Sequence, residues 1–124
     1  MGKYQTLVAW QRAMDLVDAV YLAVSTFPKS EVFALTQQMK SAAVSVPSNI
    51  AEGCGRGTYK QERRFCRDAR GSLYELQTQI DIATRQQFLS ADAAAQLKQL
   101  AARVGMLNNP YLQSVEKEIR TPDA

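Results

Sequence analysis

Residues 58–87 read TYKQERRFCRDARGSLYELQTQIDIATRQQ, and this stretch decides the fold class. Its apolar residues recur every three or four positions, so they share one side of a wheel drawn at about 100° per residue. They are Phe65, Ala69, Leu73, Leu76, Ile80 and Ala83. A helix with one apolar side must pack that side against other elements. The spacing predicts a long amphipathic helix over about residues 59–87, with Thr58 as its N-cap.

Three further stretches have the same helical spacing, and we find no strand pattern, internal repeat or linker. The expected helices span about residues 7–27, 31–53 and 91–113. Pro28 ends the first of them, and Ser30 and Ser90 are candidate N-caps for the other two.

Short connections between four helices predict an all-α fold, an antiparallel up-down four-helix bundle. We expect residues 1–124 to form a single domain and the polar tail at 116–124 to fray. Gly71 lies in the middle of the third helix, where the close approach of a neighbouring helix would be one reason to tolerate it.

The composition excludes several classes of function. The chain has 124 residues and no histidine, so it cannot form a Ser-His-Asp triad, a Cys-His pair or an H-E-x-x-H zinc site. Cys54 and Cys66 do not have C-x-x-C spacing and are interpreted as free thiols of a reducing compartment. No apolar run is long enough to span a membrane. We therefore expect a cytoplasmic protein that is not an enzyme, with no metal site, no cofactor and no evident small-molecule substrate.

Positive charge is concentrated in one short segment. The chain carries a formal net charge of +3, and residues 56–70 hold six of its fifteen basic residues against only Glu62 and Asp68. The six are Arg56, Lys60, Arg63, Arg64, Arg67 and Arg70. They fall within an arc of about 120° on the side opposite the apolar residues. Arginine forks suit bidentate phosphate contacts, so this stripe is a candidate surface for nucleic acid. The alternative is a solvated helix face, or arginines that pair with acidic groups of a neighbouring subunit.

A second polar group surrounds a proline inside the second helix. Pro47 removes one backbone donor and is predicted to kink the helix there. Ser48, Asn49 and Glu52 follow it within two turns. These residues are a candidate polar or metal site, but we favour a structural role, in which they satisfy backbone groups freed by the proline and cap the glycine-rich loop.

Several long motifs are distinctive. Residues 42–53 read AAVSVPSNIAEG and are followed by Arg56, and residues 69–79 read ARGSLYELQTQ. Together with VAWQRAM at 8–14 and FP at 27–28, they resemble the bacterial four-helix-bundle family of 23S rRNA intervening-sequence proteins. The resemblance covers about residues 5–112. The accessory variability determinant of diversity-generating retroelements is similar in fold.

The resemblance implies a four-helix bundle that assembles into a homopentamer, and its retroelement relative contacts nucleic acid and a reverse transcriptase through a basic surface. Our leading hypothesis is a non-enzymatic homo-oligomer that binds RNA or DNA through the stripe on the third helix. The rival hypothesis is a protein-interaction scaffold, in which the stripe docks an acidic protein or forms the subunit interface.

Overall fold

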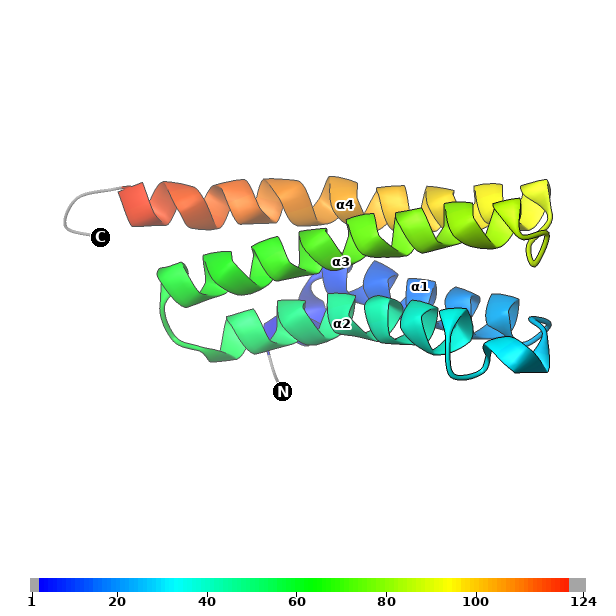
Figure 1. The fold of residues 1–124 in the computed structure, drawn as a ribbon. Helices are drawn as coiled ribbons and strands as arrows, with labels where there is room; N and C mark the ends of the chain where they lie inside the picture. Colours follow the sequence, from blue (N-terminus) through cyan, green and yellow to red (C-terminus); the bar gives the residue numbers. More distant parts are fainter. Residues whose placement is uncertain (1–2, 121–124) are drawn as a thin grey trace.

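The structure is a computed structural model that describes residues 3–120. Within these residues the chain forms four α-helices and two short 3-10 helices, with no strand. In chain order they are η1 (Lys3–Thr6), α1 (Val8–Val24), η2 (Lys29–Glu31), α2 (Leu35–Gly55), α3 (Tyr59–Arg85) and α4 (Ala91–Arg120). Figure 1 shows the four helices running alternately up and down. The predicted four-helix fold is therefore confirmed.

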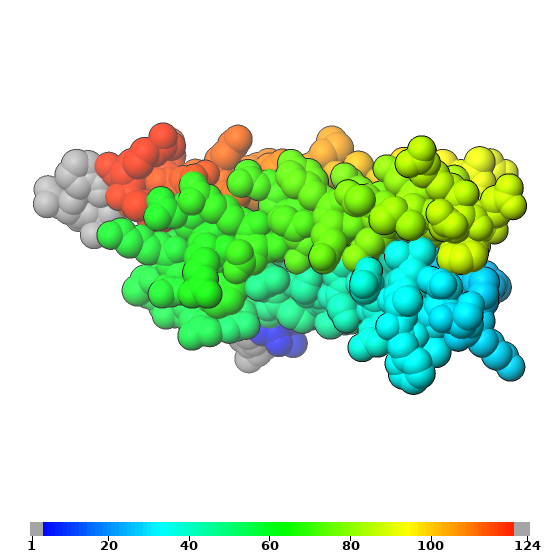
Figure 2. Space-filling model, viewed as in Figure 1, coloured from blue at the N-terminus to red at the C-terminus, as the bar shows by residue number. Residues whose placement is uncertain are grey.

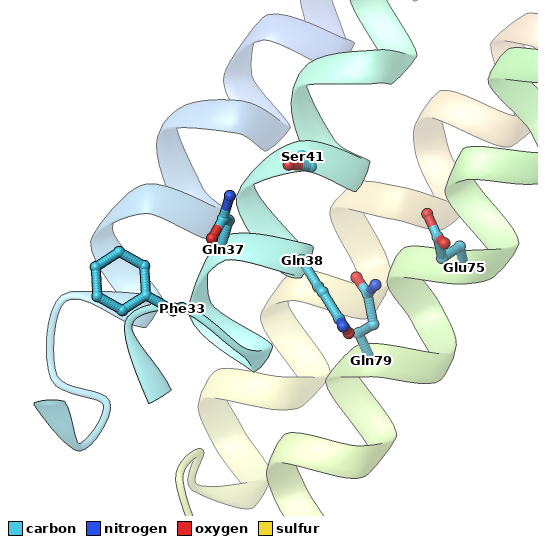
Figure 3. Close-up of a pocket in the computed structure, with 6 residues that line it drawn as sticks. All are labelled: Phe33, Gln37, Gln38, Ser41, Glu75 and Gln79. Atoms are coloured by element: carbon cyan, nitrogen blue, oxygen red, sulfur yellow. The ribbon is translucent and has the colours of Figure 1, made fainter. Parts of the chain in front are cut away.

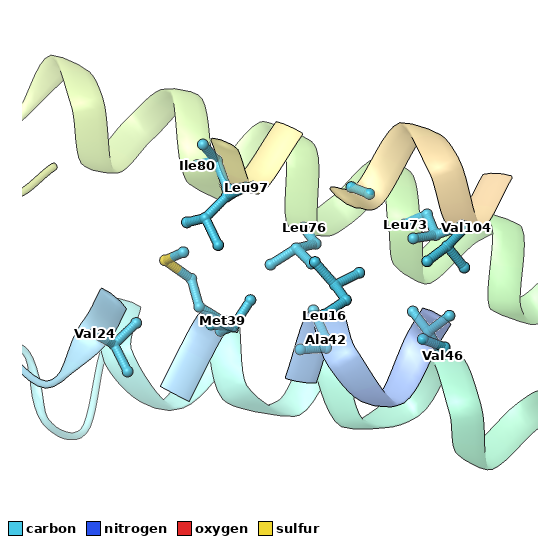
Figure 4. Close-up of a cluster of buried hydrophobic side chains, with 14 of the residues drawn as sticks. Leu16, Val24, Met39, Ala42, Val46, Leu73, Leu76, Ile80, Leu97 and Val104 are labelled. Atoms are coloured by element: carbon cyan, nitrogen blue, oxygen red, sulfur yellow. The ribbon is translucent and has the colours of Figure 1, made fainter. Parts of the chain in front are cut away.

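The helices are arranged as a square in which each contacts two neighbours. α1 packs against α2 and α4, and α3 packs against the same two helices. The core between them is aliphatic, and Leu16, Met39, Leu76 and Val104 are all completely buried. These side chains converge between the helices (Figure 4). No helix of the described part of the chain has a stretch long and apolar enough to cross a membrane.

The bundle is uneven in length. α1 has 17 residues, whereas α3 has 27 and α4 has 30. Figure 1 shows the C-terminal part of α4 and the first turns of α3 extending beyond the start of α1. At this end α3 has α2 on one side and α4 on the other. Residues 56–70, which hold the six clustered basic residues, lie here.

The first connection differs from the prediction. α1 ends at Val24 instead of about residue 27, where the backbone N–H groups of Ser25 and Phe27 donate to the carbonyls of Leu22 and Val24, three residues back, in place of the α-helical bonds. Phe27 then folds back, and its ring lies 5.5 Å from that of Phe88.

The start of α2 was also predicted wrongly. Ser30 does not cap it, because residues 29–31 form a 3-10 turn and the α-helix begins only at Leu35. Phe33, whose spacing fits the apolar side of the helix, is 89% exposed. Pro47 does not end α2, which continues to Gly55.

The other two caps are confirmed. The backbone N–H of Gln61 donates to the Thr58 hydroxyl at 3.3 Å, and that of Ala93 donates to the Ser90 hydroxyl at 3.1 Å. α3 ends at Arg85, two residues before the predicted end, because Gln87 takes a left-handed conformation with a φ of 65°. This conformation lets the N–H groups that follow turn back to the last carbonyls of the helix.

α4 continues to Arg120 and through Pro110, well past the predicted end near residue 113. The predicted frayed tail is therefore wrong for residues 116–120, while 121–124 lie outside the described residues. Two features explain the extra turns. The side chain of Val115 is buried, with only 4% of it exposed, and the carboxylate of Glu116 accepts a hydrogen bond from Arg67 at 2.7 Å.

The glycine that allows close helix packing is Gly53 and not Gly71. A Cβ added at Gly71 would meet no atom within 4 Å, whereas one added at Gly53 would lie 3.0 Å from the Cβ of Phe65. Gly53 therefore sits where α2 and α3 come closest together.

Candidate nucleic-acid interface

We call the six cations of residues 56–70 the basic face. They are Arg56, Lys60, Arg63, Arg64, Arg67 and Arg70. Arg56 lies in the loop before α3, and the other five lie on the first half of α3. This helix is strongly amphipathic, and its opposite side is buried through Phe65, Ala69 and Leu73. Side chains of α3 cover much of the surface shown in Figure 2. The helix thus presents its cations outward because its apolar side is held in the core.

Two members of the basic face have carboxylate partners. Arg56 pairs with Glu52 at i,i+4, and Arg67 pairs with Glu116 of α4 at 2.7 Å. Both pairs are at least partly exposed, and exposed pairs of this kind contribute only about 0–1 kcal/mol. A competing anion could therefore displace either carboxylate at small cost.

The other four cations have no ion pair with any described residue. Lys60 and Arg64 are exposed, and Arg63 and Arg70 are half-buried. The guanidinium of Arg64 lies 5.4 Å from the ring centre of Phe65, so its stem packs along the surface while its charge faces solvent. These four charges are available to an external ligand.

One of the two acids in the segment does not face outward. Glu62 is only 8% exposed, and its carboxylate accepts a hydrogen bond from the hydroxyl of Tyr111 on α4. Burial, with a further contribution from this bond, raises the pKa of Tyr111 well above its usual value. Asp68 is then the one exposed carboxylate among residues 56–70. Glu62 and Asp68 are equivalent by residue type, but the fold buries the first and exposes the second.

A polar network that the sequence did not reveal surrounds Glu62. The thiol of Cys54 lies 3.6 Å from the Tyr111 hydroxyl, and the side-chain amide of Asn108 donates to the carbonyl of Cys66 at 3.2 Å. Neither Cys54 nor Cys66 forms a disulfide, and burial raises the pKa of Cys66 to about 12. The spacing of Asn108 and Tyr111 on one helix side was the available signal, but polar residues at such positions do not identify their partners.

The polar residues around Pro47 bond within their own helix or to its neighbours. The Ser48 hydroxyl donates to the carbonyl of Val44 at 2.8 Å, and the Asn49 amide donates to that of Ser45, also at 2.8 Å. Glu52 is engaged by Arg56. No three potential metal-binding side chains converge among the described residues. These contacts are those of a structural element, which meets the basic face only through the pair of Glu52 with Arg56.

The surface between α2 and α3 is neutral to acidic farther along α3, beyond the basic face. A hollow of about 350 Å³ lies between α2 and α3 (Figure 3). It is lined by Phe33, Gln37, Gln38, Ser41, Glu75 and Gln79. Gln38 and Gln79 reach toward each other across the two helices, and Glu75 is the one charged residue of this lining. The lining contains no cation, so this hollow is not part of the basic face.

The comparison with known proteins agrees with the fold. The model of the 23S rRNA-intervening sequence protein family matches residues 5–109, which include α1, α2, α3 with the whole basic face, and the first part of α4. No curated protein matches the chain. Since the family match covers most of the sequence, the chain belongs to the 23S rRNA-intervening sequence protein family.

Proposed function

We propose that the protein binds nucleic acid, structured RNA in the first place, through the basic face of α3, and that it does so as a homo-oligomer without catalysing a reaction. The observation that carries the proposal is the row of unpaired cations. Lys60, Arg63, Arg64 and Arg70 have no carboxylate partner among the described residues, and of the two acids among residues 56–70 Glu62 is buried, which leaves Asp68 as the exposed one.

The chemistry of these groups suits a phosphate backbone. Guanidinium groups stay charged at every physiological pH and bind phosphate oxygens bidentately. Such contacts position a ligand without reading its bases, so sequence preference should be weak. The name of the family, which refers to an intervening sequence of 23S rRNA, supports RNA as the ligand.

Self-association would strengthen binding by repetition. A ring of identical subunits presents the basic face once per subunit, and linked weak sites gain affinity when a ligand reaches several of them. We expect a homopentamer, which is the assembly that the family resemblance implies. Light scattering on the purified protein measures the mass directly, and a monomer would remove this part of the proposal.

The test is a salt titration of binding to a structured RNA and to duplex DNA. Each neutralised phosphate on duplex DNA contributes a slope of about −0.9 in log K against log salt. The test variant reverses Lys60 and Arg64, which are exposed and have no ion pairs to lose. Its matched control reverses Lys29 and Arg103, which are also exposed but lie on η2 and α4.

We expect the Lys60→Glu, Arg64→Glu variant to bind at least tenfold more weakly, with a slope about two units shallower. The control changes the net charge equally and should keep most of its affinity. Equal losses in both variants would contradict a localised site. If the test variant instead loses its oligomeric state, and the wild type binds no nucleic acid at low salt, the basic face is a protein interface and the scaffold hypothesis replaces this one.

A further inference from the structure

The seam between α3 and α4 is open in its middle. It is closed on one side by the ion pair of Arg67 with Glu116 and on the other by that of Asp81 with Lys98. Between these pairs lies a small hollow of about 180 Å³. Its lining includes Arg70 and Tyr74 from α3 and Gly105, Met106 and Asn109 from α4.

Small residues of α4 create this hollow. Ala101, Ala102 and Gly105 form the α4 side of its floor, and a Cβ added at Gly105 would still be 4.0 Å from the nearest atom, on Leu73. Large apolar groups stand at its edge instead of filling it. Tyr74 is 60% exposed and Met106 is 74% exposed. An aromatic ring and a thioether thus border a shallow floor that is open to solvent.

The electrostatics of the hollow favour an anionic ligand with a flat apolar part. Arg70 is the one charged residue in the lining, and it belongs to the basic face. Gln77 and Asn109 add amide groups that can both donate and accept hydrogen bonds. Glu75 is adjacent in sequence to Tyr74 but lines the hollow on the α2 side of the helix.

We propose that this hollow receives one unpaired nucleobase, stacked on the ring of Tyr74, while the phosphate beside that base contacts Arg70. The inference rests on the proposed function and deepens it, because it names single-stranded RNA, such as a loop or an end, as the preferred part of the ligand. Stacking of exposed bases on aromatic side chains is the usual way in which proteins hold single strands, and it tolerates any base.

The size of the hollow matches this occupant. Sites that enclose a drug-sized ligand measure about 300–1,000 Å³, so 180 Å³ suits a single ring system. Bases inside a duplex are already stacked on each other and cannot reach Tyr74. A duplex can still contact Arg64 and Lys60 through its phosphates, so the two kinds of RNA should depend on different residues.

The experiment compares the affinities of two probes, an oligoadenylate RNA and a duplex RNA of the same length, for the full-length protein at low salt. The variants are Tyr74→Ala and Tyr74→Phe. The matched control is Tyr21→Ala, which removes a tyrosine that is 45% exposed on α1. Since both tyrosines are exposed, each variant should fold, and circular dichroism checks this directly.

We expect Tyr74→Ala to weaken oligoadenylate binding by about 5- to 150-fold, the range for loss of one stacked base, and to leave duplex binding unchanged. Tyr74→Phe keeps the ring and should bind both probes like the wild type, as should Tyr21→Ala. Oligoadenylate binding that is unaffected by Tyr74→Ala, or an equal loss on both probes, would overturn the stacking site. If duplex binding still falls in the Lys60→Glu, Arg64→Glu variant, the proposed function survives that result. If the wild type binds neither probe, both proposals fail.

Discussion

Two glycine-to-alanine substitutions should change stability in opposite directions. Gly53 and Gly71 both lie inside helices, so alanine should stabilise each helix by about 0.5–1 kcal/mol through the backbone entropy of the unfolded chain. The difference arises from packing. At Gly71 the new methyl group meets no atom within 4 Å. Gly71→Ala should therefore gain nearly the whole helix contribution.

At Gly53 there is no space for the same methyl group. It would lie 3.0 Å from the Cβ of Phe65 and 3.4 Å from the backbone oxygen of Glu62. These are atoms of the α3 backbone or next to it, so a side-chain rotation cannot make room. Overpacking of this kind costs about 1–3 kcal/mol, which exceeds the gain in helix propensity. Gly53→Ala should be less stable than the wild type.

Urea unfolding followed by circular dichroism measures both variants. We expect Gly71→Ala to be more stable than Gly53→Ala by about 1–3 kcal/mol, with the wild type between them. Because both changes add one methyl group to a helical glycine, propensity alone predicts equal effects. Equal stabilities of the two variants would therefore refute the close contact between α2 and α3 at Gly53.

Three further predictions concern the network around Glu62 and the charge of the basic face. Tyr111→Phe should lower the free energy of unfolding by about 1–3 kcal/mol in a urea titration, because the buried carboxylate of Glu62 loses its donor; a change below 0.5 kcal/mol would contradict that bond. Burial raises the pKa of Cys66 from 9.0 to about 12, so the folded state holds this proton more tightly than the unfolded state. The free energy of unfolding should thus lose this contribution as pH rises from 9 to 12, and Cys66→Ala should flatten that fall, whereas an unchanged slope would refute the assignment. Asp68→Asn should strengthen RNA binding about twofold at low salt. The substitution removes the repulsion between a carboxylate and a phosphate about 10 Å away from it, and in water this repulsion corresponds to about a twofold change in affinity. Glu62→Gln, measured in parallel, should have less effect on affinity because its side chain faces away from the ligand; a larger effect than that of Asp68→Asn would refute this placement.

Local signals in the sequence predicted the helices and part of their ends. The spacing of apolar residues identifies the buried side of α3, since a period of about 3.6 residues depends only on helix geometry. Thr58 and Ser90 are correct as caps for a similar reason. A hydroxyl at the N-cap bonds to an N–H two or three residues later, so neither partner needs the rest of the fold.

The errors arise where distant residues decide. Ser30 is a good cap by type, but the chain after Pro28 forms a 3-10 turn and leaves Phe33 exposed. α4 extends to Arg120 because Glu116 pairs with Arg67, forty-nine positions away in the sequence. The composition of residues 116–124 indicates only a polar tail.

The sequence predicted which residues form the candidate site, but not which of them are paired or buried. The periodicity that buries one side of α3 necessarily gathers the cations on the other. The i,i+4 spacing of Glu52 and Arg56 is visible in the sequence, but the pairing of Arg67 with Glu116 and the hydrogen bond from Tyr111 to Glu62 are not. Each of these two contacts depends on a residue of α4 that is forty-nine positions away. Tyr74 shows the same limit, because its exposure matters only once Gly105 is known to face it.

Because the helices differ in length, the end of the bundle that carries the basic face is stabilised differently from the rest. α1 does not reach the end where α3 begins, so the main aliphatic core does not extend there, and Phe65 and Leu112 are buried outside it. Hydrogen bonds and an ion pair between α3 and α4 supply much of the connection at this end. Asn108 takes part in this connection only through its amide group, because its side-chain oxygen is buried without a hydrogen-bond partner among the described residues. Both the ion pair of Arg67 and the buried position of Glu62 depend on partners from α4, so the net charge that the basic face shows to a ligand depends on how α3 and α4 pack.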